Sequence, residues 1–127
     1  MKIWPVEAEI THDTEVFGKI DPYVVMSSRE QTWKSKTAGD AGKTPKWKHH
    51  DGHFNVEVKF LGDDIKYHLW DEDTLSKDDD IAEGSCHLSA FTREGESVIE
   101  EWFGLKYKGK DAGRIKFRAE WCPAKKD

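Results

Sequence analysis

The acidic residues of this chain gather in one short segment, and their spacing suits a hard cation. Six of the ten residues in 71–80 are Asp or Glu, and Asp71, Asp73 and Asp79 stand at positions i, i+2 and i+8. Ca²⁺ takes about six to eight oxygen ligands, many of them carboxylate oxygens. A loop with this spacing can fold three carboxylates around one point, so the segment predicts a cation site.

An EF-hand also begins with acids at i and i+2, but this loop does not continue as one. An EF-hand requires Gly at the sixth position and Glu at the twelfth. Counted from Asp71, these positions hold Ser76 and Ala82. The EF-hand interpretation is therefore rejected.

Other chemistries have weaker support in the sequence. His49, His50 and His53 form a local cluster, but no further ligands at suitable spacing favour zinc. We find no nucleophile motif, glycine-rich phosphate loop or paired acid–base site, so we expect a protein that is not an enzyme. The net charge of −5 argues against a partner made of nucleic acid. Basic residues gather in 34–48, apart from the acidic segment, so a cation and an anion could bind at separate places.

Alternation of apolar and polar residues predicts strands along most of the chain. Eight short strands with turn signals between them indicate an all-β, antiparallel β-sandwich. A short helical turn in 90–99 is the one helical expectation. The predicted strands cover 2–10, 21–28, 32–37, 54–60, 64–71, 81–89, 101–107 and 113–121.

The 127 residues suffice for one domain with a real core, and we place it at 1–122 with a short flexible tail at 123–127. No apolar run has the roughly 20 residues needed to cross a bilayer, and the first residues contain no signal-peptide core. A cytoplasmic location is the expectation. Cys86 and Cys122 are expected to be reduced thiols rather than a disulfide.

Four motifs, in order and at matching spacing, resemble the C2 domain family across nearly the whole chain. The resemblance is to small stand-alone C2 proteins and, because the chain starts at the strand before the first calcium loop and has an extra last strand, to the type II topology. The motifs are Gly18 with Asp21-Pro22-Tyr23-Val24, Thr44-Pro45-Lys46-Trp47, Asp71-x-Asp73 with Asp79, and Glu101-Trp102 with Leu105.

The resemblance implies a calcium site made by two loops. Asp21, Asp71, Asp73 and Asp79 stand where the family places calcium-binding aspartates, and Glu15 occupies the fifth such position. Glutamate is still an oxygen donor, but its extra methylene moves the carboxylate outward, which affects affinity and the number of ions. The backbone carbonyls of Thr14 and Glu72 correspond to main-chain ligands.

The resemblance also implies two surfaces for phospholipid. Val16, Phe17 and Leu75 stand at loop tips that the family inserts among lipid headgroups; the alternative is that Phe17 folds back onto the core. Lys34 and Lys36 share one strand face, and Lys59 is expected on the neighbouring strand, as a patch for anionic headgroups. The alternative is that these are ordinary solvated lysines.

The function that this implies is Ca²⁺-dependent, peripheral docking on anionic phospholipid membranes, in signalling or trafficking. A filled site would turn the negative loops neutral or positive and allow lipid phosphates to complete the coordination. The second hypothesis is a structural module that binds a protein partner within a larger assembly, with calcium weak or incidental.

Overall fold

The computed structural model describes residues 1–11, 20–39 and 42–121 and is built almost entirely of strands. Two 3₁₀ turns lie in connections between strands: η1 (His49–Asp51) before β4 and η2 (Leu88–Phe91) after β6. The strands are β1 (Lys2–Ile10), β2 (Pro22–Ser28), β3 (Gln31–Lys34), β4 (Phe54–Asn55), β5 (Asp64–Asp71), β6 (Asp79–His87), β7 (Val98–Tyr107) and β8 (Lys110–Glu120).

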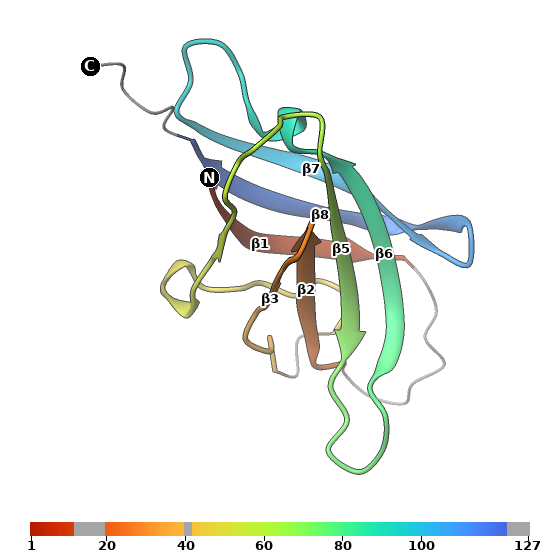
Figure 1. Ribbon diagram of the computed structural model, residues 1–127. Helices are drawn as coiled ribbons and strands as arrows, with labels where there is room; N and C mark the ends of the chain where they lie inside the picture. The colour runs from red at the N-terminus through yellow and green to blue at the C-terminus, as the bar shows by residue number, and fades with distance from the viewer. Residues whose placement is uncertain (12–19, 40–41, 122–127) are drawn as a thin grey trace.

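The strands form a nearly closed antiparallel sandwich in the order β3-β2-β5-β6-β7-β8-β1-β4. β5 and β6 pair along their whole length, whereas β6 and β7 meet at the pair Glu83 and Lys106. The sheet therefore bends between β6 and β7, and its two halves pack face to face, as Figure 1 shows. β8, the extra last strand, lies between β7 and β1.

The core fills the space between the two halves with alternate residues of facing strands. On β5, Ile65, Tyr67 and Leu69 are buried, and on β8 Ile115 and Phe117 are buried opposite them. The Tyr67 and Phe117 rings meet edge to face with centroids 5.2 Å apart. This period-two burial is the physical reason why the predicted strands form.

Most predicted strands are confirmed, including 2–10 and 64–71 with their boundaries. The prediction for 54–60 is wrong, because β4 contains Phe54–Asn55 alone. Phe60, at the end of that range, is 63% exposed. The segment leaves the sheet after Asn55 and does not continue as a strand. Val56 nevertheless packs into the core.

Smaller differences concern strand ends and the aromatic residues. β6 begins at Asp79 and β7 at Val98, both earlier than predicted, and the helical turn η2 ends at Phe91, so it overlaps only the start of the expected range 90–99. Trp121, expected to point inward, is half-buried. Cys86 is a free, half-buried thiol whose burial raises its pKa to about 12, and Cys122 lies outside the described residues. In the part of the chain that the structure describes, there is no helix with the length and apolar character needed to cross a membrane.

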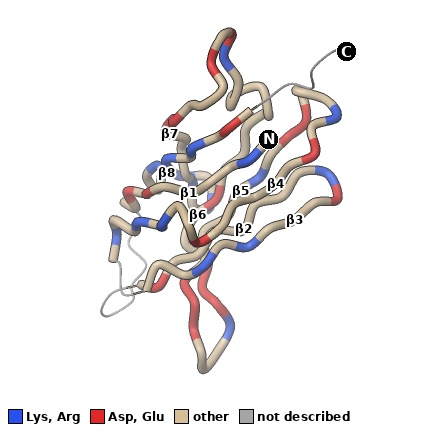
Figure 2. Tube along the Cα trace, turned by 90° about the vertical axis from the view of Figure 1, so that its left-hand side faces the viewer, with Lys and Arg blue, Asp and Glu red and all other residues tan. Residues whose placement is uncertain are grey.

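Charge is distributed unevenly over the two ends of the sandwich. The loop between β5 and β6 projects beyond the strands, and Figure 2 shows acidic residues along both of its arms. The N-terminus lies toward the other end, where the Met1 ammonium group donates to the Val56 carbonyl at 3.0 Å. The fold therefore gives the acidic loop an end of its own.

Candidate functional site: the acidic loop end of the sandwich

The pairing of β2, β5 and β6 brings three of the predicted aspartates, Asp21, Asp71 and Asp79, to one end of these strands. Asp71 ends β5 and pairs with Asp79 at the start of β6. On its other side Asp71 pairs with Pro22, and its Oδ1 accepts the backbone N–H of Asp21 at 2.9 Å. The backbone N–H of Glu72 donates to the Asp21 carbonyl at 3.0 Å. Two sequence segments about fifty residues apart are thus tied together at the site.

Asp71 is the most buried of the four aspartates. Its residue is 8% exposed, which is unusual for an aspartate. Burial raises its pKa, and the negative charges of Asp21, Asp79 and Asp73 raise it further, against a lowering by the hydrogen bond from Asp21. Three carboxylates therefore act on Asp71, and together the four make this end of the sandwich negative.

Asp73 lies on the exposed loop and is turned toward its own backbone. Its carboxylate accepts the N–H of Leu75 at 2.9 Å and the hydroxyl of Ser76 at 2.8 Å. These hydrogen bonds, the one from Leu75 first, lower the pKa of Asp73 and keep it ionised. The same turn presents Leu75, the predicted membrane tip, with its side chain 95% exposed.

The carboxylates are neighbours but do not form a ready-made coordination sphere. Across the described residues 1–11, 20–39 and 42–121, no three Asp, Glu, His or Cys side chains are arranged to hold a metal ion. The hydrogen bonds of Asp71 and Asp73 account for part of this, because each carboxylate is directed at a backbone N–H. The donor set nevertheless suits a hard cation, since it consists of carboxylate oxygens around a buried negative charge.

Part of the predicted site falls outside the described residues, namely Glu15, Thr14, Val16 and Phe17. Of the main-chain ligands, only Glu72 is described, and its side chain accepts the Thr37 hydroxyl at 2.6 Å. The motif Thr44-Pro45-Lys46-Trp47 lies beside β1. There the Pro45 carbonyl accepts the N–H of Ala8 and the backbone N–H of Trp47 donates to Val6, both at 3.0 Å.

Sequence reasoning missed Asp78, which the structure places at the end of the loop, directly before β6. Its Oδ1 accepts the Asp73 N–H at 2.9 Å, and its Oδ2 accepts the hydroxyl of Tyr23. The Asp73 N–H bond, then the Tyr23 bond, lower the pKa of Asp78, and the charge of Lys34 adds a smaller lowering. The run of three aspartates at 78–80 was the available signal, but only the fold shows which carboxylate turns toward β2.

The strand predicted at 32–37 is shorter than expected, since β3 ends at Lys34 and Lys36 lies beyond it. Both lysines are exposed and flank Ser35, which is buried and whose Oγ accepts the N–H of Val24 at 2.8 Å. The Lys34 ammonium lies 4.3 Å from the centroid of the Tyr23 ring, a cation–π contact. Lys34 is thus held beside the acidic loop rather than free in solvent.

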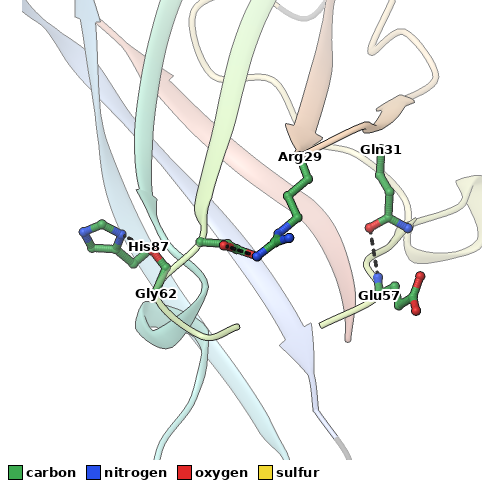
Figure 3. A network of polar contacts seen from close by, with 6 residues as sticks. Arg29, Gln31, Glu57, Gly62 and His87 are labelled. Atoms are coloured by element: carbon green, nitrogen blue, oxygen red, sulfur yellow. Dashed lines mark hydrogen bonds and ion pairs between the residues drawn. The ribbon is translucent and has the colours of Figure 1, made fainter. Parts of the chain in front are cut away.

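Lys59 lies beyond β4, so the expectation that it stands on a neighbouring strand is wrong. It lies in a hollow with Arg29, Gln31 and Glu57. Figure 3 shows the surrounding network, in which the Gln31 side chain accepts the Glu57 N–H at 3.0 Å. Arg29 forms an ion pair with Asp63, which precedes β5. Because β5 rises about 3.3 Å per residue, this hollow lies roughly 25 Å from Asp71.

Two further features bear on ligand binding. A groove of about 1210 Å³ follows the face where β2, β5, β6 and β7 meet, and Trp70, His68 and Phe103 contribute to its lining. The His68 ring stacks on Trp70 with centroids 4.2 Å apart. In the histidine cluster considered for zinc, the rings of His49 and His53 pack against the Trp4 ring, at centroid distances of 4.5 and 4.7 Å.

An eight-stranded antiparallel sandwich with paired aspartates at one loop end defines the class of the protein, and comparison with known families agrees. The sequence model of the C2 domain matches residues 1–105, so the chain belongs to the C2 domain family. The chain also matches the solved structure titled C2 domain-containing protein from putative elicitor-responsive gene. That match has a TM-score of 0.77 and 25% identity, and covers 99% of this chain and 90% of the other.

Relatives include both small and large proteins. Elicitor-responsive protein 3 of Oryza sativa subsp. japonica is 28% identical over 123 residues, covering 97% of this chain and 83% of that protein. Extended synaptotagmin-2-A of Xenopus laevis is 32% identical over 106 residues, or 84% of this chain, but this is only 11% of that protein. A calcium-bound structure of two C2 domains of Extended-Synaptotagmin 2 matches with a TM-score of 0.70 and 28% identity, covering 94% of this chain and 44% of that one.

Proposed function

We propose that this C2 domain binds Ca²⁺ between the loops at the acidic end and then docks on anionic phospholipid as a peripheral, cytoplasmic protein. One observation carries the proposal. Asp71 is buried as a carboxylate with Asp21, Asp73 and Asp79 close enough to raise its pKa. Like charges gathered without a cation repel one another, and a divalent cation turns this repulsion into attraction.

The residues that would hold the ion come from two segments. Asp21, Asp71, Asp73 and Asp79 supply carboxylates, with Glu15 in the fifth position and the carbonyls of Thr14 and Glu72 as main-chain ligands. Binding requires Asp73 to exchange its hydrogen bonds to Leu75 and Ser76 for the metal. This exchange would reorder the loop that presents Leu75.

Calcium would change the sign of the charge that the loop end presents to a membrane. Without the ion, the carboxylates repel the anionic surface; with it, lipid phosphates can complete the coordination. Leu75, and Val16 and Phe17 of the first loop, would then enter the headgroup region. Lys34 and Lys36 would contact phosphates from the adjoining face, whereas the distance of Lys59 from Asp71 assigns it no part in this contact.

The relatives support a binding module rather than an enzyme. They are C2 domain proteins, and one matching structure is calcium-bound. We take residues 1–122 as the docking unit. Because the chain spans only 11% of Extended synaptotagmin-2-A and 46% of Elicitor-responsive protein 1 of Oryza sativa subsp. japonica, the activity of a whole relative does not transfer with the domain.

The direct test is calorimetry with Ca²⁺ followed by co-sedimentation with phosphatidylserine vesicles. Asp71→Asn together with Asp73→Asn should weaken Ca²⁺ binding by roughly a hundredfold or more, because two ligand charges are lost. Vesicle binding should disappear with it. Glu94→Gln together with Glu96→Gln makes the same change in net charge on a distant loop and should leave both measurements unchanged. Absence of heat from the wild-type protein at millimolar Ca²⁺ would refute the metal site.

A second candidate function is supported by the groove on the β2, β5, β6 and β7 face. Its aromatic and charged lining resembles a surface for a protein partner. This function requires no calcium. If the wild-type protein ignores vesicles at saturating Ca²⁺ yet retains a protein partner in the presence of chelator, the protein-binding function replaces membrane docking.

A further inference from the structure

Asp78 joins the acidic loop to β2 through both of its carboxylate oxygens. Oδ1 accepts the backbone N–H of Asp73 at 2.9 Å, and Oδ2 accepts the hydroxyl of Tyr23. Its residue is only partly exposed, unlike Asp79 and Asp80, which follow it. Asp78 is therefore a fixed carboxylate rather than a solvated one.

The same tyrosine also carries Lys34. The Lys34 ammonium lies 4.3 Å from the centroid of the Tyr23 ring, while Asp78 contacts the hydroxyl of that ring. A phenol hydroxyl, an ammonium group and a carboxylate thus lie along one side chain, with Lys36 exposed further along the chain. The exposed ammonium group suits a phosphate and the carboxylate opposes one, while Tyr23, itself only 7% exposed, holds the two groups in place.

The carboxylate opposes a phosphate through its charge, which the bond to Tyr23 holds in a fixed place. The negative charge of Asp78 repels each phosphate charge that approaches Lys34. The repulsion grows with the charge of the incoming group, so it discriminates most strongly against a headgroup with several phosphates.

We propose that Asp78 is a specificity-determining residue, which keeps multiply phosphorylated lipid headgroups off the Lys34–Tyr23 surface; this inference rests on the proposed membrane docking. The wild-type domain therefore prefers lipids with a single phosphate, such as phosphatidylserine, and engages them through calcium. The exposed Lys34, with Lys36 beyond it, remains a latent site for an inositol lipid with several phosphates.

Asp78 also supports the loop, and the two roles can be separated by substitution. Asp78→Asn removes the charge but keeps an oxygen that can accept the Asp73 N–H. Asp78→Ala removes both. Only the charge matters for headgroup selectivity, whereas the hydrogen bond to Asp73 matters for calcium.

The experiment measures binding to phosphatidylcholine vesicles that contain a few mole per cent of phosphatidylinositol 4,5-bisphosphate, in chelator, so that calcium affinity plays no part. Asp78→Asn should bind these vesicles about fivefold more tightly than the wild-type protein, given one charge removed near a polyanion. Asp78→Asn combined with Lys34→Ala should lose this gain, because the gain acts through the lysine. Glu94→Gln, which changes net charge equally on a distant loop, should show no gain.

A gain of equal size in Glu94→Gln, or no gain in Asp78→Asn, overturns the inference. A gain that survives Lys34→Ala overturns it as well. Thermal melting of each variant shows that it is folded. Parallel binding to phosphatidylserine vesicles with Ca²⁺ tests the proposed docking separately: if the wild-type protein binds them and Asp78→Asn gains nothing in chelator, only the specificity assignment fails. If the wild-type protein binds neither kind of vesicle and Asp78→Asn gains nothing, both fail.

Discussion

Asp71 is a carboxylate that the fold buries among other carboxylates, and this placement costs stability in the absence of a cation. The pKa of Asp71 is raised by burial and then by Asp21, Asp79 and Asp73. A raised pKa means that the native state holds the proton more tightly than the unfolded chain does. Its contribution to stability is present below the unfolded pKa and is lost as the pH rises through the folded pKa.

At neutral pH without calcium, Asp71→Asn should therefore stabilise the domain. Asparagine keeps an oxygen to accept the Asp21 N–H and removes the buried charge, so a gain of about 0.5–1 kcal/mol, or several degrees in melting temperature, is expected. Calcium should raise the melting temperature of the wild-type protein but not that of the variant. The check is thermal melting with chelator and with Ca²⁺, with Glu94→Gln as the control. A variant that melts below the wild-type protein in chelator would show that the charge itself is needed by the fold.

At the scale of elements, the pairing of β8 with β1 depends on one glycine with a positive φ. Gly113 lies between Ile10 of β1 and Leu105 of β7, with a φ of 116°. A Cβ at this position would lie 2.0 Å from the backbone oxygen of Glu9. Both the dihedral angle and the contact exclude a side chain while β8 stays paired with β1.

Gly113→Ala should therefore destabilise the domain by about 2–4 kcal/mol, since strain and a backbone clash act together. Gly104 on β7 provides the matched control, because a Cβ there would meet no atom within 4 Å. Gly104→Ala should stay within about 0.5 kcal/mol of the wild-type protein. Urea unfolding monitored by tryptophan fluorescence measures both. Equal losses in the two variants would contradict the assigned role of the β8–β1 contact.

For the molecule as a whole, the acidic end combines charge with an exposed apolar tip. Leu75 is 95% exposed on the loop that carries Asp73. Salt screens the calcium-mediated contact over about 8 Å at physiological ionic strength, but it does not screen burial of a leucine. Membrane binding should therefore contain a salt-resistant part that comes from the tip.

Leu75→Ala should remove much of that salt-resistant part. Full burial of a leucine is worth roughly 1.5–3 kcal/mol, and partial insertion at an interface is worth less. Co-sedimentation with phosphatidylserine vesicles at saturating Ca²⁺, at low and high salt, should show a larger relative loss at high salt. Val98→Ala, at a 40% exposed residue on β7, removes apolar surface away from the loop and should have no effect. A loss of the same size from Val98→Ala would show that the tip has no special part in docking.

The local pattern of the sequence predicted most of the strands. It also predicted that Asp71 and Asp79 lie close together, at the two ends of the β5–β6 loop. Alternation has a period of two, and that period is written in neighbouring residues, so both ends of the strand at 64–71 follow from the residues themselves. Asp71 and Asp79 could be assigned for a similar reason, since they flank one hairpin loop and need no distant partner to meet. The spacing of the four C2 motifs then indicated the fold.

What only the tertiary structure decided concerns residues whose roles depend on a distant neighbour. Lys59 and Phe60 continue the alternation of 54–60, but the chain leaves the sheet after Asn55, so neither lies on a strand and Phe60 is exposed. Asp78 looks like its neighbours in the sequence, yet the β2–β5 pairing brings Tyr23 to its carboxylate from 55 residues away. Alternation predicts which face a side chain takes, whereas the pairing of strands decides what that face meets.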